Sequence, residues 1–69
     1  MDAVEIGMRI RKLRGSESQQ VLAKKLEISK SALAMYERGE RIPRDEVKIR
    51  IARYFGVSLE SIFFAKSEH

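Results

Sequence analysis

Residues Gln19 to Gly39 read QQVLAKKLEISKSALAMYERG. Apolar side chains recur through this segment at helical intervals, with one break at residues 27–29, and this pattern predicts two short helices joined by a tight turn. Ser18 and Ser29 precede the two helices as N-cap residues, and Gly39 stands where a left-handed residue would end the second. Helices this short, joined by so short a connection, must cross steeply, as in a helix-turn-helix.

The flanking sequence predicts three more helices and an all-α fold. Gly15 and Gly56 mark helix ends, and Asp45 and Ser58 are expected to cap the last two helices. The five predicted helices span residues 3–14, 18–26, 30–38, 45–55 and 58–63.

The length of 69 residues is typical of a single small domain. We expect one helix-turn-helix domain over residues 1–69, with a core at about 3–63 and an extended or frayed tail over 64–69. A hydrophobic core this small is marginally stable alone, so association with a second copy would stabilise it.

The composition argues against several classes of protein. There is no cysteine, and the single histidine is the terminal His69, so neither a Ser/His/Asp nor a Cys/His catalytic constellation is available. The sequence therefore predicts no enzyme activity, no metal, no cofactor and no small-molecule ligand. No apolar run approaches a membrane span, and residues 1–10 lack the pattern of a signal peptide, so a cytoplasmic location is expected.

Positive charge is concentrated in the middle of the sequence. The formal net charge is +4, but the segment from Arg9 to Arg53 holds 13 basic and 6 acidic side chains. Outside it stand one basic and four acidic side chains. This distribution favours a polyanionic partner, although lysine and arginine also serve simply to solvate helix surfaces.

The order of these residues resembles the Cro/CI-type (Xre-like, lambda-repressor-like) helix-turn-helix family. The resemblance covers about residues 6–63 and implies a compact five-helix domain with the helix-turn-helix at its second and third helices. It also implies a sequence-specific double-stranded DNA-binding transcription regulator of bacterial or phage origin, with a repressor expected. Such a protein binds a palindromic operator as a homodimer, with the helix at 30–38 in the major groove. The matching residues are Ser18, Gln19, Leu22, Ala23, Leu26, Ile28, Ser29, Tyr36, Glu37, Arg38, Gly39 and Pro43.

Two positions depart from the family pattern. Glu17 stands where a leucine often precedes the capping serine, which removes a hydrophobic staple. Glu27 stands where glycine is common because the backbone there often takes positive φ, and a non-glycine residue in that conformation costs about 1 kcal/mol.

The resemblance assigns DNA contacts to two groups of residues. The expected base contacts lie on the outer face of the helix at 30–38, where small residues let the backbone approach a groove about 12 Å wide. Lys30 suits guanine, and Met35 suits a thymine methyl group. The full set of expected base contacts is Lys30, Ser31, Ala34 and Met35. The expected backbone contacts are Gln19, Arg38, Arg41 and Arg44.

Two further assignments concern structure and assembly. The resemblance pairs Arg14 with Glu37 in a partly buried ion pair, and it implies that Gln19 also braces the start of the helix at 30–38. The expected dimer interface comprises Leu59, Ile62, Phe63 and Phe64. Because two adjacent phenylalanines cannot both face one small core, we expect one of them to meet a second subunit; the alternative is that Phe64 folds over the first helix. An antitoxin-like regulator or a protein–protein adaptor that uses these apolar residues stays open as an alternative function.

Overall fold

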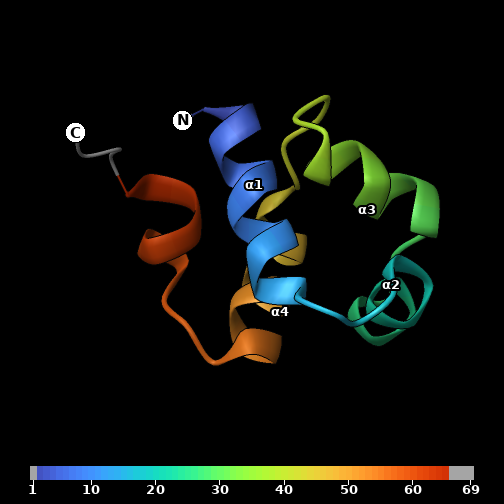
Figure 1. The fold of residues 1–69 in the computed structure, drawn as a ribbon. Coiled ribbons are helices and arrows are strands. Elements are labelled where there is room, and N and C mark those ends of the chain that lie inside the picture. The colour runs from blue at the N-terminus through green and yellow to red at the C-terminus, as the bar shows by residue number, and fades with distance from the viewer. Residues whose placement is uncertain (1, 66–69) are drawn as a thin grey trace.

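The computed structural model describes residues 2–65, and all of its regular structure there is helical (Figure 1). This confirms the all-α, five-helix prediction. None of the helices within these residues has the length and apolar character needed to span a membrane. The elements are α1 (Ala3–Arg14), α2 (Gln19–Leu26), α3 (Lys30–Glu37), α4 (Asp45–Phe55) and η1 (Glu60–Phe64).

Polar caps determine where the first three helices begin. Asp2 caps α1, because its Oδ1 accepts a hydrogen bond from the Val4 N–H at 2.9 Å. Ser18 and Ser29 cap α2 and α3 in the same manner. The expectation that Asp45 caps α4 is wrong: Asp45 is the first helical residue, where its charge suits the helix dipole, and Arg44 before it provides no side-chain cap.

The core forms where α1 lies between the helix-turn-helix and η1 (Figure 1). Gly7 allows α1 to approach α3 closely, because a Cβ atom there would collide with the carbonyl oxygens of Tyr36 and Glu37. The largest fully buried side chains are Ile6, Ile10, Leu22, Leu26, Leu33, Ile51, Ile62 and Phe63.

The last helix differs from its predicted form. It is a widened, π-type turn over Glu60–Phe64. Ser58 precedes this turn, and its hydroxyl accepts a hydrogen bond from the Ser61 N–H at 3.1 Å. Phe64, which was expected to belong to the tail, is the last helical residue, and Ala65 is extended. Residues 66–69 of the predicted tail lie outside the described residues.

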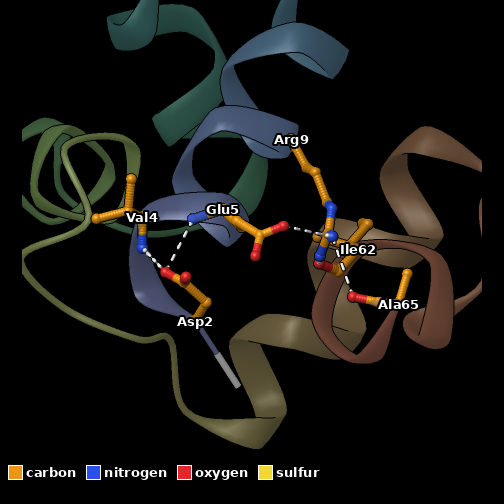
Figure 2. A network of polar contacts seen from close by, with 6 residues as sticks. All are labelled: Asp2, Val4, Glu5, Arg9, Ile62 and Ala65. Atoms are coloured by element: carbon orange, nitrogen blue, oxygen red, sulfur yellow. Dashed lines mark hydrogen bonds and ion pairs between the residues drawn. The ribbon is translucent and has the colours of Figure 1, made fainter. Parts of the chain in front are cut away.

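One arginine fastens this last helix to α1, as Figure 2 shows. Arg9 donates from Nη1 to the Ile62 carbonyl at 2.9 Å and from Nη2 to the Ala65 carbonyl at 3.0 Å. The Glu5 carboxylate, one helical turn earlier, lies 3.3 Å from Nη2 and keeps the guanidinium in place. Arg9 therefore satisfies carbonyl groups that the end of a helix leaves without a helical partner.

Candidate nucleic-acid interface

The turn between α2 and α3 has the left-handed conformation expected at Glu27, with φ 60° and ψ 40°. The Glu27 N–H donates to the Lys24 carbonyl at 3.1 Å, and the Ile28 N–H donates to the Ala23 carbonyl at 3.0 Å. These two hydrogen bonds close the end of α2 in a Schellman motif. The Ser29 hydroxyl then accepts from the Ala32 N–H at 2.9 Å and starts α3 in its new direction.

The two faces of α3 differ in exposure. Leu33 and Tyr36 are buried, as the pattern predicted. Lys30 and Ser31 are exposed at the start of the helix, whereas Ala34 and Met35 are half-buried. The four expected base-contacting residues therefore follow one face of α3, with its most accessible side chains in the first turn.

A largely buried polar cluster holds the far end of α3. Arg14 and Glu37, the two expected partners, lie with Nε 2.7 Å from Oε2 and Nη2 3.0 Å from Oε1. Their side chains are 13% and 3% exposed. The hydrogen bond to Glu37 raises the pKa of Arg14, and a further bond to the Glu17 carbonyl at 2.7 Å holds its Nη1.

Gln19 belongs to the same cluster. Its Nε2 donates to Glu37 Oε1 at 2.9 Å, so this amide braces the last residue of α3. The expectation that Gln19 braces the start of that helix is therefore wrong. Because Gln19 is also the first residue of α2, its half-buried side chain lies at the edge of the helix-turn-helix.

The three arginines expected at the DNA backbone differ in their surroundings. Arg38 is held by Glu40, with Nε 2.6 Å from Oε2, and both side chains are more than half exposed. Arg41 and Arg44 are exposed and line a hollow of about 280 Å³ between the turn at Glu27 and the first turns of α4. Arg38, Arg41 and Arg44 are therefore exposed basic side chains that follow α3, and we refer to them as the basic border.

Sequence reasoning missed the role of Arg50. This half-buried residue of α4 lines the same hollow and donates from Nη1 to the Leu26 carbonyl at 2.9 Å. No local pattern in the sequence identifies such a contact, because the two partners lie 24 positions apart.

A polar contact stands where the hydrophobic staple is missing before α2. The Glu17 carboxylate accepts from Lys25 Nζ at 3.0 Å and from the Tyr54 hydroxyl at 3.0 Å, which links the start of the helix-turn-helix to α4. The hydrogen bond from Lys25 lowers the pKa of Glu17, and the same bond raises the pKa of Lys25.

The predicted dimer residues separate into two groups. Ile62 and Phe63 are each 1% exposed and pack in the core of this chain, so the expectation that they face a second subunit is corrected. Leu59 and Phe64 are 37% and 57% exposed. The Phe64 ring lies 5.7 Å from Lys48 Nζ on α4, and so it does not fold over α1 as in the alternative considered above.

An exposed α4 residue joins these two. Ile49 is 41% exposed and lines a shallow hollow together with Leu59, Phe64, Asp45 and Lys48. We refer to Ile49, Leu59 and Phe64 as the C-terminal apolar surface. The sequence analysis assigned Leu59 and Phe64 to an interface but did not include Ile49. Ile49 lies next to the buried-face positions of α4, and its exposure depends on how that helix packs against the rest of the chain.

The steep crossing of α2 and α3 (Figure 1), the exposed first turn of α3 and the basic border define a helix-turn-helix DNA-binding domain. Comparison with known proteins agrees with this class. The family model described as "Helix-turn-helix" matches residues 9–62, and the chain belongs to this family of Cro/CI-type (Xre-like) DNA-binding transcription regulators.

Two relatives give the extent of the similarity. An uncharacterized HTH-type transcriptional regulator of Methanocaldococcus jannaschii is 35% identical over 51 residues, which are 74% of this chain and 77% of the relative. The crystal structure of the restriction-modification controller protein C.AhdI from Aeromonas hydrophila superposes with a TM-score of 0.80 at 28% identity. That match covers 90% of this chain and 93% of C.AhdI.

Proposed function

We propose that this protein is a sequence-specific double-stranded DNA-binding repressor that acts in the cytoplasm and inserts α3 into the major groove. One observation carries the proposal: the first turn of α3 is exposed at Lys30 and Ser31, while its last residue, Glu37, is held by Arg14 and Gln19. A recognition helix must present free side chains from a rigidly held backbone. The similarity to an HTH-type transcriptional regulator and to a restriction-modification controller supports a role in transcription.

Sequence is read from the outer face of α3. The Lys30 ammonium suits the O6 and N7 acceptors of guanine, and the Met35 thioether side chain suits a thymine methyl group. Ser31 and Ala34 are small, so they allow the helix to lie deep in the groove and add short-range contacts of their own.

Register on the duplex comes from contacts that do not read sequence. Gln19 stands at the start of α2, where an amide and the positive end of the helix dipole attract a phosphate. Arg38, Arg41 and Arg44 border the recognition face and meet phosphate or the minor groove. Each phosphate contact releases counterions, so binding weakens as the salt concentration rises.

The protein binds a palindromic operator as a homodimer through the C-terminal apolar surface. Ile49, Leu59 and Phe64 are large apolar side chains that this chain leaves exposed together. A two-fold dimer reads two half-sites about one helical turn apart, and burial of this surface would also support the small core. Phe64→Ser should shift sedimentation toward the monomer, whereas Val21→Ser, at an exposed valine on another face, should not.

The experiment that tests the function is a selection from a random duplex pool at about 150 mM salt. An enriched inverted repeat supports the proposal. Lys30→Ala and Met35→Ala should then change the preferred sequence, while Arg44→Ala should weaken binding to all duplexes alike. Enrichment of no sequence, together with binding that disappears as salt rises, would reject sequence-specific readout.

A protein–protein role is the second candidate, either as an adaptor or as an antitoxin-like regulator. The exposed Phe64 and Leu59 favour it, because they offer an apolar surface that a different protein can cover as well as a second copy can. An adaptor has no need of the basic border, so a protein that keeps its partner after Lys30→Ala and Arg44→Ala but selects no DNA would belong to this class.

A further inference from the structure

We propose that Arg50 is a positioning residue for sequence recognition: from α4 it holds the turn between α2 and α3 and so sets the angle at which α3 meets DNA. The proposal rests on the proposed function, since it concerns how the recognition helix is held. It assigns no DNA contact to Arg50 itself.

The contacts of Arg50 converge on the end of α2. Its Nη1 lies 2.9 Å from the Leu26 carbonyl oxygen and 3.4 Å from the Glu27 carbonyl oxygen. The last carbonyl groups of a helix have no partner within the helix, and a guanidinium is well suited to satisfy two of them at once. Arg50 therefore ties α4 to the residue that ends α2 and to the residue that makes the turn.

A second helix end in the molecule shows why this turn benefits from an outside contact. α4 ends in the same motif: Gly56 has φ 66° and ψ 34°, and the Val57 N–H donates to the Ala52 carbonyl at 3.0 Å. Glycine adopts that conformation freely, and a Cβ atom added there would meet nothing within 4 Å. The residue in the corresponding position of α2 is Glu27, the one non-glycine residue with positive φ within residues 2–65.

Because Glu27 has a Cβ atom, its left-handed backbone is disfavoured in isolation and persists only where neighbouring groups hold it. Its own two turn bonds are the same as those at Gly56, so they do not account for the difference. The added element at Glu27 is Arg50. We therefore infer that Arg50 stabilises the left-handed backbone at Glu27, which a glycine in that position would adopt without such help.

The turn matters for recognition because it connects α2 directly to the start of α3. Base-edge contacts require side chains to be placed within about 0.5 Å, whereas long basic side chains can follow a phosphate over larger shifts. Loosening the turn should therefore reduce discrimination between sequences more than it reduces affinity for DNA in general.

The first test compares Arg50→Met with Arg53→Met. Arg53 lies on the same helix, is exposed and makes no side-chain hydrogen bond to any residue in 2–65, so it controls for the loss of one positive charge. For Arg50→Met, the ratio of affinities for the selected operator and a scrambled duplex should fall about tenfold, with no more than about a threefold loss on the scrambled duplex. Arg53→Met should leave the ratio within about twofold. An equal loss on both duplexes, or an unchanged ratio, would overturn the proposal.

The second test asks whether Arg50 acts through the turn. Glu27→Gly removes the Cβ atom, so Arg50→Met in that background should lower the ratio by only about twofold. Glu27→Gln removes the charge but keeps the Cβ atom, and in that background the full loss should remain. Equal losses in the two backgrounds would show that the left-handed residue is not what Arg50 supports.

A third measurement needs no DNA. Hydrogen exchange at the Glu27 and Ile28 amides should become about tenfold faster in Arg50→Met and stay unchanged in Arg53→Met. If the parent protein prefers no sequence, the proposed function fails, and this exchange measurement still decides whether Arg50 holds the turn. Unchanged exchange at both amides would overturn the assignment.

Discussion

The end of α3 carries two ion pairs in opposite surroundings. Glu37 points inward and meets Arg14 with side chains that are 3% and 13% exposed. The next residue, Arg38, points outward and meets Glu40 with side chains that are 57% and 53% exposed. The closest N–O distances, 2.7 Å and 2.6 Å, are almost the same.

The comparison shows that surroundings, and not geometry, decide what an ion pair does. The inner carboxylate has left water, so it depends on Arg14 and Gln19 for compensation. The outer pair has more than half of each side chain exposed to solvent, so salt screens it. The bond between Arg38 and Glu40 raises the pKa of the first and lowers the pKa of the second, but either partner can exchange the other for water or for a DNA phosphate.

Breaking the inner pair should have the largest effect on the molecule. Arg14→Met leaves Glu37 buried with only the Gln19 amide as a partner, so we expect the free energy of unfolding to fall by about 3 kcal/mol. Chemical denaturation at pH 7 measures this change. Arg11→Met, at an exposed arginine of the same helix, is the matched control and should change stability by less than about 0.5 kcal/mol.

A double variant sharpens the result. Arg14→Met with Glu37→Gln removes both charges and should recover part of the lost stability, since no buried charge is then left alone. If Glu37→Gln instead lowers the free energy of unfolding of Arg14→Met further, the Arg14–Glu37 pair does not behave as a buried ion pair.

The sequence predicted the helices well because their signals are local. Ser18, Ser29 and Gly56 act within one turn of where they stand, and the apolar period repeats within each helix. The left-handed turn at Glu27 was also predicted, from the residue that the family prefers there. Asp45 was misplaced by one position, because a cap residue and a first-turn residue share the same acidic preference.

Contacts between distant segments could not be predicted in this way. The bonds from Arg50 to Leu26 and from Tyr54 to Glu17 join positions that no periodicity relates. The burial of Ile62 and Phe63 depends on a π-type turn, which changes which side chains share a face. For the DNA site, the family resemblance supplied candidate residues. It did not predict the contact that holds Arg38 to Glu40, because that contact depends on how the loop after α3 bends.

The second-largest effect on stability should come from adding a methyl group at Gly7, where α1 and α3 are in close contact. Gly7→Ala places a methyl group against the carbonyl groups of Tyr36 and Glu37, which are backbone atoms and cannot rotate away. We expect a loss of about 2 kcal/mol despite the better helix propensity of alanine. Thermal unfolding measures it, with Met8→Ala at an exposed neighbour as the control.

This change also tests the inner pair. Displacing the end of α3 from α1 should lengthen the Arg14–Glu37 contact, so Gly7→Ala and Arg14→Met together should cost less than the sum of the two. Full additivity would mean that the close approach at Gly7 and the ion pair are independent.

The outer pair should affect DNA binding and not stability. Glu40→Gln frees Arg38 and removes a negative charge beside the recognition face, so affinity for any duplex at low salt should rise about threefold to fivefold. Fluorescence anisotropy with a scrambled duplex measures the gain.

Glu46→Gln, at an exposed acid in the first turn of α4, controls for charge alone and should give a smaller gain. In an Arg38→Ala background, the gain from Glu40→Gln should shrink to the size of that control; a gain that persists in full would show that Glu40 does not act on Arg38.

The smallest effect should come from Glu17, whose pair with Lys25 lies between the two extremes, with side chains 23% and 50% exposed. The bond from Lys25 lowers the pKa of Glu17 in the folded protein below the ordinary value of 4.5. A depressed folded pKa means that the stabilisation is present above that ordinary value and is lost as the pH falls through the folded pKa.

Between pH 7 and pH 3, the melting temperature of the parent should therefore fall slightly more than that of Glu17→Gln. Glu60→Gln, at an exposed acid with no side-chain hydrogen bond to residues 2–65, should follow the parent. If Glu17→Gln also follows the parent, the contact from Glu17 to Lys25 and Tyr54 adds nothing to stability.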